Sequence, residues 1–457
     1  SCEEELKITG ARYNMSTSNT VTEPGRDLRV YAECDVLVIG GGPAGCGAAA
    51  AAADAGANVI LMERYGHLGG MSTGGFVLWI DRMTDWSGNH VIGGFATELL
   101  DRLPPEGLLG PDPELWGSKD QALVDYWGDR SAAFQGVVTW SPTVDPELLK
   151  NVSIDVLEEK GVKLLMHSWG VQALVEDNQV KGGIFESKSG RQAILAKVTI
   201  DATGDGDVFD FAGAEHVNDV VEDNIHHRMN VAFLWGDIDL NQYLDFKNNN
   251  PDDFRAVMAE GSKVNVVDRP HAMPRNDMAL FMGPRLAGYS CIDVDDLSTV
   301  EAESRRRMME MIEFYRKKLP GFENAYVHTT APQMGTRHSR RLVGVTQMQR
   351  SDWTSGVIHD DEIGISPAPN ARHPNVSVPY NSLVPIKVNG LLAAGRCLST
   401  DPITHTFMRE VPQSWLLGQG AGAAAAQAVN KGIEVRDVNI QELQAELRKQ
   451  GVILHDN

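Results

Sequence analysis

CDVLVIGGGPAG, residues 34–45, is the stretch that decides the fold of this chain. The aliphatic run at residues 35–39 is typical of a buried parallel strand, and an alanine-rich segment after the glycines predicts a helix to about residue 55. Gly56 ends that helix, and residues 58–62 predict a second strand. A strand, a helix and a strand within about thirty residues form a βαβ unit. The sequence therefore predicts an α/β fold with a parallel sheet.

Three glycines in this stretch have the spacing G-x-G-x-x-G, at the end of a predicted strand and the start of a predicted helix. In a dinucleotide-binding turn, Gly40 makes the tight turn, Gly42 lets a pyrophosphate approach the backbone, and Gly45 lets helix and strand pack closely. Glu63 lies 63 − 40 = 23 residues after the first glycine, where a carboxylate accepts hydrogen bonds from ribose. The alternative is a tight turn without a ligand. The full set of features favours a dinucleotide site.

A second glycine-rich loop, RYGHLGGMSTGG at residues 64–75, follows the second predicted strand. Backbone with few side chains can lie along an extended cofactor beyond its adenosine half, which nicotinamide-binding domains do not need. Two later predicted strands end in related turns, IDATGD at residues 200–205 and LAAGRC at residues 392–397.

The run from residue 34 to residue 454 resembles the FAD-dependent oxidoreductases that are distantly similar to fumarate reductase flavoproteins, with the FAD fold of the glutathione-reductase type. The tRNA-modifying flavoprotein is a further relative. The resemblance rests on CDVLVIGGGPAG, MERYGHLGGMSTGG, VIGGFATELLDRL, IDATGDGDV, PGFENAYV, GTRHSRRLVG, YNSLVP, LLAAGRCLS and GQGAGAAAA. It implies FAD as the cofactor. The residues that it implies for the FAD site are Gly40, Gly42, Pro43, Ala44, Gly45, Glu63, Arg64, Gly69, Gly70, Met71, Ser72, Asp205, Gly395 and Arg396.

The same resemblance implies a Rossmann-type FAD-binding domain that is discontinuous in sequence, with an inserted α+β substrate domain. We assign residues 1–31 to an N-terminal arm, and residues 32–100, 146–215 and 385–435 to the FAD-binding domain. Residues 101–145 form an irregular insertion, residues 216–384 a substrate or cap domain, and residues 436–457 a C-terminal helical tail.

The sequence departs from the family pattern at three places. Where many relatives read Ser-x-Thr-His-Glu, this chain reads STDPITH at residues 399–405, so the histidine is displaced. His226-His227-Arg228 stands where relatives are mostly apolar, and His67 stands where an aromatic residue is common. We expect these positions on the substrate side of the site, and His67 is also a candidate for covalent flavin attachment. The candidate substrate residues are His67, His226, His227, Arg228, Arg337 and Asp401.

His405 and Arg409 are the candidate catalytic residues. His405 fits a base near the flavin ring, which removes a proton while a hydride leaves the adjacent carbon. A structural histidine is an equally good interpretation. Arg409 fits a clamp for an anionic substrate or a charge that stabilises the reduced flavin, with a structural ion pair as the alternative. The four-residue offset places both on one side of a helix that Pro402 can begin.

Composition excludes several classes of function. Acidic residues outnumber basic ones by 62 to 41, a formal net charge of −21, which disfavours nucleic-acid binding. Five scattered cysteines form no C-x-x-C pair, which argues against zinc and iron–sulfur sites and favours a reducing compartment, so we expect the cytoplasm. We expect no metal, no membrane span and no secretory signal, and a homo-oligomer is the candidate assembly.

The sequence thus predicts an enzyme, an FAD-dependent dehydrogenase or reductase that moves a hydride between a small organic molecule and the flavin N5. We find no second G-x-G-x-x-G between residues 75 and 395, so no dedicated NAD(P)H domain is expected, and the electron acceptor or donor is unknown. The alternatives are an O₂-using flavin oxidase or monooxygenase, a tRNA-modification flavoprotein and a non-catalytic flavin-binding protein.

Overall fold

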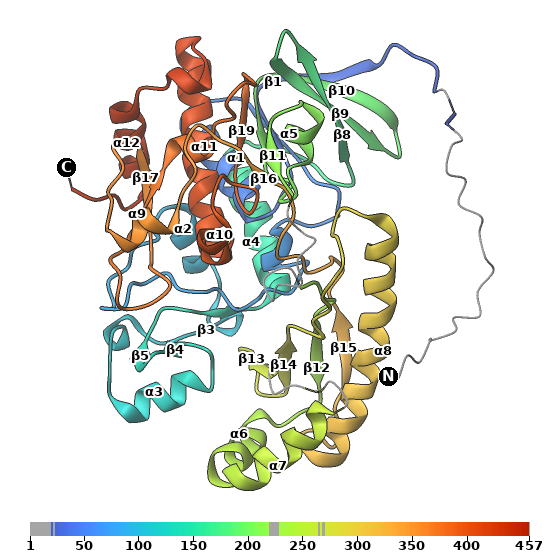
Figure 1. Ribbon diagram of the computed structural model, residues 1–457, viewed down its shortest axis with the longest axis vertical. Helices are drawn as coiled ribbons and strands as arrows, with labels where there is room; N and C mark the ends of the chain where they lie inside the picture. The colour runs from blue at the N-terminus through green and yellow to red at the C-terminus, as the bar shows by residue number, and fades with distance from the viewer. Residues whose placement is uncertain (1–19, 22, 219–227, 264–265, 267–269, 457) are drawn as a thin grey trace.

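The computed structural model describes residues 20–21, 23–218, 228–263, 266 and 270–456 (Figure 1). A seven-stranded sheet, here called the main sheet, lies in the upper part of the molecule in this view. Its parallel part has the order β7-β2-β1-β10-β19, and an antiparallel extension adds β9 and β8 to the first half of the long strand β10. The strands are β1 (Arg29–Ile39), β2 (Val59–Met62), β7 (Lys163–Leu165), β8 (Trp169–Glu176), β9 (Gln179–Ser187), β10 (Gly190–Asp201) and β19 (Leu391–Ala393). The predicted parallel sheet is therefore confirmed.

Two helices pack side by side against the parallel strands. They are α1 (Pro43–Asp54) and α11 (Val411–Lys431), and nearly all of their residues are buried. A Cβ atom added to Gly418 would lie 1.9 Å from the carbonyl oxygen of Ala44, and one added to Gly422 would lie 2.1 Å from that of Ala48. Because the contacts advance along both helices together, the helices run parallel. The glycines of the GQGAG motif are what let the two backbones approach this closely.

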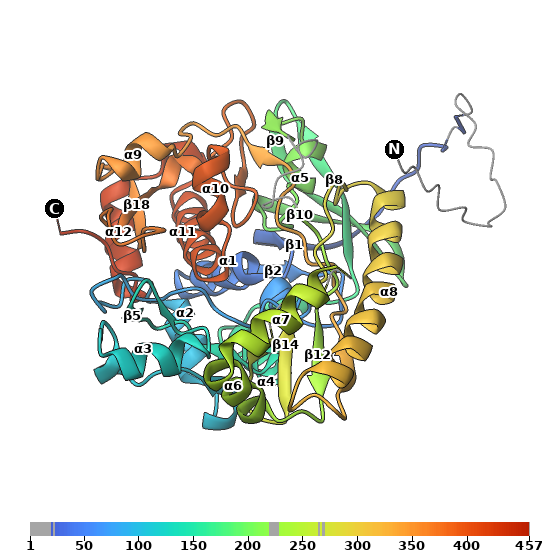
Figure 2. The ribbon, with the colours of Figure 1, turned by 60° about the horizontal axis from the view of Figure 1, so that its bottom comes forward.

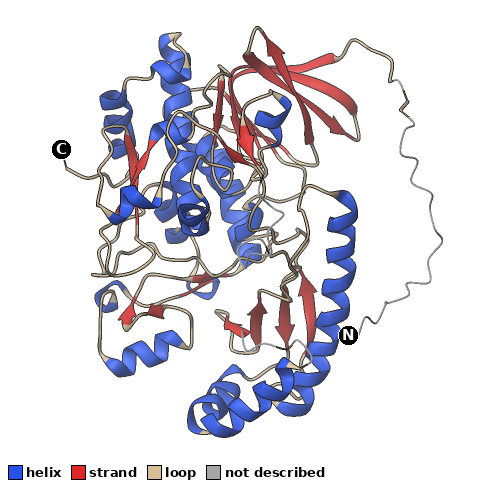
Figure 3. Ribbon diagram, viewed as in Figure 1, coloured by secondary structure: helices blue, strands red, loops and turns tan. Residues whose placement is uncertain are grey.

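Residues 216–384 contribute a second, smaller sheet with the order β13-β14-β12-β15, here called the small sheet. Figure 3 shows it as a separate group of strands below the main sheet. Its strands are β12 (Phe233–Gly236), β13 (Pro270–Ala272), β14 (Met278–Phe281) and β15 (Tyr326–Thr330). The long helix α8 (Val294–Lys318) lies beside it, and α6 (Leu240–Asn249) and α7 (Pro251–Ser262) lie at its end (Figures 1 and 2). Its core is aromatic: Trp235 packs against Tyr315 and Phe322.

The last part of residues 216–384 packs with the main sheet and its helices. Strands β17 (Glu362–Ser366) and β18 (Val376–Pro379) pair with each other, and Gly364 lies against Leu416 of α11. Strand β16 (Arg341–Leu342) pairs with β11 (His216–Val217), next to the main sheet. The predicted substrate domain, residues 216–384, is thus shared between two packing environments, and its limits stay a prediction.

The remaining elements are short or peripheral. Residues 101–145, which we predict to be an insertion, contain β3 (Leu108–Leu109), α3 (Gln121–Gly128), β4 (Ala133–Phe134), β5 (Val137–Val138) and β6 (Thr143–Val144). The other helices are α2 (Phe95–Asp101), α4 (Pro146–Glu159), α5 (Asp207–Phe211), α9 (Arg350–Thr354), α10 (Pro402–Met408) and α12 (Ile440–Lys449). Within the part of the chain that the structure describes, no helix is long and apolar enough to cross a membrane.

The first testable prediction concerns the α1–α11 contact. Gly418→Ala should lower the free energy of unfolding by about 1–3 kcal/mol, because the new Cβ collides with the backbone of α1 and outweighs the gain in helix propensity. Urea denaturation followed by circular dichroism measures the change. Gly128→Ala in α3 is the matched control, since nothing lies closer than 3.9 Å to its added Cβ. Equal stability of the two variants would show that the helices can separate without cost.

Candidate FAD-binding and active site

A cavity of about 640 Å³ lies at the carboxyl ends of the parallel strands. Residues directly after four of these strands line it: Gly40 after β1, Glu63 after β2, Ala202 after β10 and Ala394 after β19. Ligands of open α/β sheets bind at this edge. The opposite wall comes from the small sheet and its connections, with Ala232, His271 and Met282. The cavity therefore lies between the two sheets.

The turn after β1 is shaped for a phosphate group. Gly40 has φ +106°, and a Cβ there would lie 2.3 Å from the oxygen of Ala202. Gly42, the N-cap of α1, has extended backbone, and a Cβ added there would meet only Gly70 Cα, at 3.9 Å. A Cβ on Gly45 would lie 1.7 Å from the oxygen of Gly40. The unpaired N–H groups and partial positive charge of the α1 N-terminus suit an anion at Gly42.

Glu63 is buried behind this turn. Its carboxylate accepts hydrogen bonds from the N–H of Gly41 at 2.6 Å and of Tyr65 at 2.9 Å. Burial raises the pKa of Glu63, and the two N–H donors oppose that shift. A carboxylate still has lone pairs for further donors, so ribose hydroxyls fit this position. Beside it, the Arg64 guanidinium lies over the rings of Tyr65 at 4.9 Å and Trp169 at 5.9 Å.

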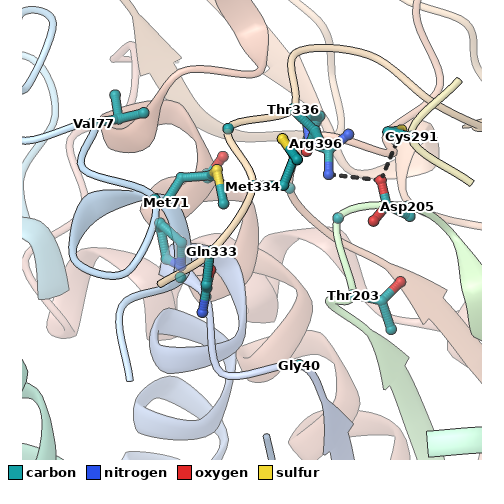
Figure 4. Close-up of a pocket in the computed structure, with 18 of the residues that line it drawn as sticks. Gly40, Met71, Val77, Thr203, Asp205, Cys291, Gln333, Met334, Thr336 and Arg396 are labelled. Carbon is teal, nitrogen blue, oxygen red and sulfur yellow. Dashed lines mark hydrogen bonds and ion pairs between the residues drawn. The ribbon is translucent and has the colours of Figure 1, made fainter. Parts of the chain in front are cut away.

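A buried polar cluster forms another part of the wall. Arg396 Nη2 donates to Asp205 Oδ1 at 2.7 Å, and Ser339 Oγ donates to the same oxygen at 2.7 Å. Cys291 Sγ lies 3.6 Å from that oxygen (Figure 4). Asp205 is buried, which raises its pKa, but Arg396 and the hydrogen bonds hold the net pKa below the usual value. The carboxylate of Asp205 is therefore held in place, with its Oδ1 accepting from both Arg396 and Ser339.

Most of the predicted cofactor residues meet in the cavity. The predicted residues that line it are Gly40, Gly42, Pro43, Ala44, Glu63, Arg64, Gly70, Met71, Asp205, Gly395 and Arg396. Gly45, Gly69 and Ser72 lie just behind the wall: Ser72 Oγ donates to the carbonyl of Gly69 at 2.8 Å, and Gly69 adopts φ +95°. These three shape the turns around the cavity and do not face it.

His405 does not reach the cavity. The predicted helix α10 is present, and Arg409 is its C-cap, with right-handed helical backbone angles and its N–H donating to the carbonyl of His405 at 3.3 Å. His405 is 2% exposed, its Nε2–H donates to the carbonyl of Arg396 at 2.8 Å, and its ring packs edge-on against His338. Burial lowers the pKa of His405 well below its usual range, with a further contribution from Arg409. This environment favours a structural role, whereas Arg409 lines the cavity.

Among the predicted substrate residues, Arg337 lines the cavity. His67 lies behind the wall, hydrogen-bonded to Gln333 at 3.0 Å, and burial lowers its pKa to about 4. Asp401 caps α10 by accepting from the N–H of Thr404 at 2.7 Å. Arg228 is half-buried and lies outside the cavity wall. His226 and His227 lie outside the described residues.

Several cavity residues escaped the sequence analysis. Trp79 and His271 line the cavity with near-parallel rings, 6.1 Å apart. Gln333, Met334 and Thr336 run between Met71 and Arg396 (Figure 4). Glu410 lies next to Arg409 at the start of α11. Thr336 lies in the motif GTRHSRRLVG, which could have indicated it, and the other residues have no periodic or motif signal. Among the described residues, no group of histidine, cysteine or acidic side chains could hold a metal.

A family model described as FAD dependent oxidoreductase matches residues 35–447. The chain belongs to this family. Its cofactor is FAD, and the turn at Gly42, the carboxylate of Glu63 and the cluster around Asp205 fit that cofactor. The resemblance stated from the sequence, the Rossmann-type α/β fold and the cofactor are thereby confirmed.

The chain is also similar to solved structures at low identity. The p-nitrophenol 4-monooxygenase of Pseudomonas putida is 14% identical, with a TM-score of 0.48, over 92% of this chain and 85% of that one. A geranylgeranyl bacteriochlorophyll reductase-like protein of Thermoplasma acidophilum is 15% identical, with a TM-score of 0.44, over 92% and 84%. No curated protein matches the sequence. Likeness at this level says nothing about the reaction of this family member.

The second prediction tests the phosphate-binding turn. Gly42→Val should fold normally, because its side chain enters open space, but the purified protein should lose FAD, because the side chain occupies the place of the pyrophosphate. FAD content is read from the visible absorption, and folding from the unfolding temperature. Gly128→Val is the control at an equally open glycine away from the cavity. A yellow, fully loaded Gly42→Val protein would contradict this placement.

Proposed function

We propose that the protein is an FAD-dependent dehydrogenase or reductase that transfers a hydride between a small organic substrate and the flavin N5. The observation that carries the proposal is one cavity with two kinds of wall. Its dinucleotide wall is part of the same cavity as Trp79 and as Ala232 and His271 from the small sheet and its connections, so a substrate at those residues would lie next to the cofactor. Hydride transfer needs such contact between substrate and cofactor.

FAD supplies the hydride chemistry when it is bound, and this chain supplies position and charge. Arg409 lines the cavity, its side chain is 11% exposed, and Glu410 lies 3.3 Å away. A guanidinium held in this way can orient a carboxylate or another polar group of a substrate by two parallel hydrogen bonds. Arg337 is the second cationic candidate on the substrate side.

We propose a different role for His405 than the base suggested by the sequence. Its Nε2–H holds the backbone carbonyl of Arg396, whose side chain holds Asp205. His405 is therefore a positioning residue for the buried polar cluster. The proposed domain limits are those given from the sequence, except that residues 341–384 pack with the main-sheet half. We also propose a cytoplasmic location, since Cys34, Cys46, Cys291 and Cys397 are free thiols.

A screen without oxygen tests the proposal. The holoenzyme is mixed with alcohols, amines and 2-hydroxy acids, and loss of flavin absorption reports reduction. Admission of air then reveals whether O₂ accepts the electrons. Rapid bleaching by one class supports a dehydrogenase or reductase. Oxygen consumption that inserts oxygen into the substrate would instead identify a monooxygenase.

The third prediction concerns Arg409. With the compound that bleaches the wild-type flavin, Arg409→Lys should reduce the rate of bleaching at least about tenfold, because an ammonium cannot make a planar two-pronged contact. His405→Gln should retain FAD and bleach at close to the wild-type rate, because its amide N–H can still donate to Arg396. A loss of ~10²–10⁴-fold in His405→Gln alone would restore His405 as the acid–base group.

The fourth prediction is that nicotinamide cofactors do not reduce the flavin directly. The sequence has one G-x-G-x-x-G turn, and the structure gives that turn to the FAD cavity. Stopped-flow mixing of the holoenzyme with NADH or NADPH under argon should leave the flavin absorption unchanged over minutes. Dithionite is the control that shows the flavin is reducible. Fast, saturable bleaching by either nucleotide would overturn the prediction.

A further inference from the structure

The N-terminus of α11 faces the FAD cavity. Val411 and Ser414 line the cavity, and Glu410 is the N-cap of the helix but makes no capping hydrogen bond with its side chain. The first turn therefore keeps unpaired N–H groups and the partial positive charge of a long helix. Both α1 and α11 thus direct their N-termini into the same cavity.

The offset between these helices places the two ends of the cofactor. Gly418 of α11 lies against Ala44 of α1, so the seven helical rises from Val411 to Gly418 place the start of α11 roughly 9 Å beyond the start of α1. A pyrophosphate held at Gly42 would leave the adenosine half toward Glu63 and Trp169. The rest of the cofactor would then extend past Gly395, and its ring would be held near Val411 and Ser414 at the start of α11.

Two opposite charges lie at this place. Arg409 Nη2 and Glu410 Oε1 are 3.3 Å apart, and their side chains are only 11% and 22% exposed. Water screens such charges poorly, so each acts on a nearby ring more strongly than a surface charge does. The positive charges are Arg409 and the helix N-terminus, and Glu410 opposes both.

We propose that the negative charge of Glu410 lowers the redox potential of the bound FAD. Reduction with fewer protons than electrons leaves negative charge on the ring, which Arg409 and α11 stabilise and Glu410 destabilises. Glu410 therefore keeps the reduced flavin a ready donor of electrons to its acceptor. The inference rests on the FAD site used in the proposed function and not on the substrate.

A second ion pair lies behind the first. Arg82 Nε lies 3.8 Å from Asp81 Oδ1, and its Nη2 donates to the carbonyl of Ala368 at 2.9 Å. Burial raises the pKa of Asp81 to about 6, with Glu410 adding to that shift and Arg82 and Arg409 opposing it. The carboxylates of Asp81 and Glu410 therefore influence each other, and the acidic and basic side chains at this place offset one another.

The experiment measures the midpoint potential of FAD in the intact holoenzyme against redox dyes. Glu410→Gln should shift the potential to more positive values, and Arg409→Met should shift it to more negative values. Sulfite, which bleaches a flavin more readily when the site stabilises negative charge, is the second probe. It should bind Glu410→Gln about tenfold more tightly, as expected of one charge about 10 Å away at an effective dielectric constant of about 20.

The controls separate charge from structure. Glu410→Asp keeps the charge and should keep the potential near that of the wild type. Glu434→Gln removes a carboxylate beyond the opposite end of α11, about 30 Å from Glu410 along the helix, and should change nothing. Opposite shifts in Glu410→Gln and Arg409→Met support the proposal, since a general loosening of the site moves both in one direction. Unchanged potentials in both variants overturn it, and wild-type protein without FAD would refute the proposed function instead.

Discussion

The close parallel packing of α1 against α11 is the contact on which the rest of the site depends. Small residues on both helices let backbone meet backbone, at Ala44 with Gly418 and at Ala48 with Gly422. One helix follows the first strand and the other begins more than 350 residues later, after the last strand of the sheet. Their packing brings both N-termini to one cavity, so a chain interrupted by a second sheet still makes one dinucleotide site.

Charge is organised along that cavity in pairs. Arg396 is bound to Asp205, Arg409 lies beside Glu410, and Arg340 bridges Asp207 and Asp210 behind the wall. Burying a charge without a partner costs free energy, so each of these arginines needs its carboxylate partner in order to remain buried. The acidic partners also limit how positive the cavity becomes. In this strongly acidic chain, Arg396, Arg409 and Arg340 thus each have a carboxylate close by.

The sequence was sufficient where the signal is local. The glycine turn, the strand before it and Glu63 are specified by neighbours in the chain, and the structure has all of them in place. The two catalytic candidates differ in burial, which the sequence does not reveal. The four-residue offset is present, since the N–H of Arg409 donates to the carbonyl of His405, but His405 is buried away from the cavity whereas Arg409 lines it. Trp79 and His271 had no local signal, because their meeting depends on how the small sheet packs.

The same limit applies to the arginine run after residue 336. Arg340 is bound to the acids of α5, Arg341 is buried against the carbonyl of Thr400, and Arg337 alone of the three lines the cavity. Only Arg341 of the three lies in a strand, β16, and its place depends on pairing with β11, which composition cannot reveal.

A crystal structure of the holoenzyme is the most direct test of the central claim that one FAD lies between the two helix N-termini. Electron density should show the pyrophosphate within hydrogen-bonding distance of the backbone N–H groups after Gly42 and the flavin ring beside Val411 and Ser414. Density for FAD with its ring away from α11, or a fully loaded protein whose cavity holds no FAD, would contradict the claim.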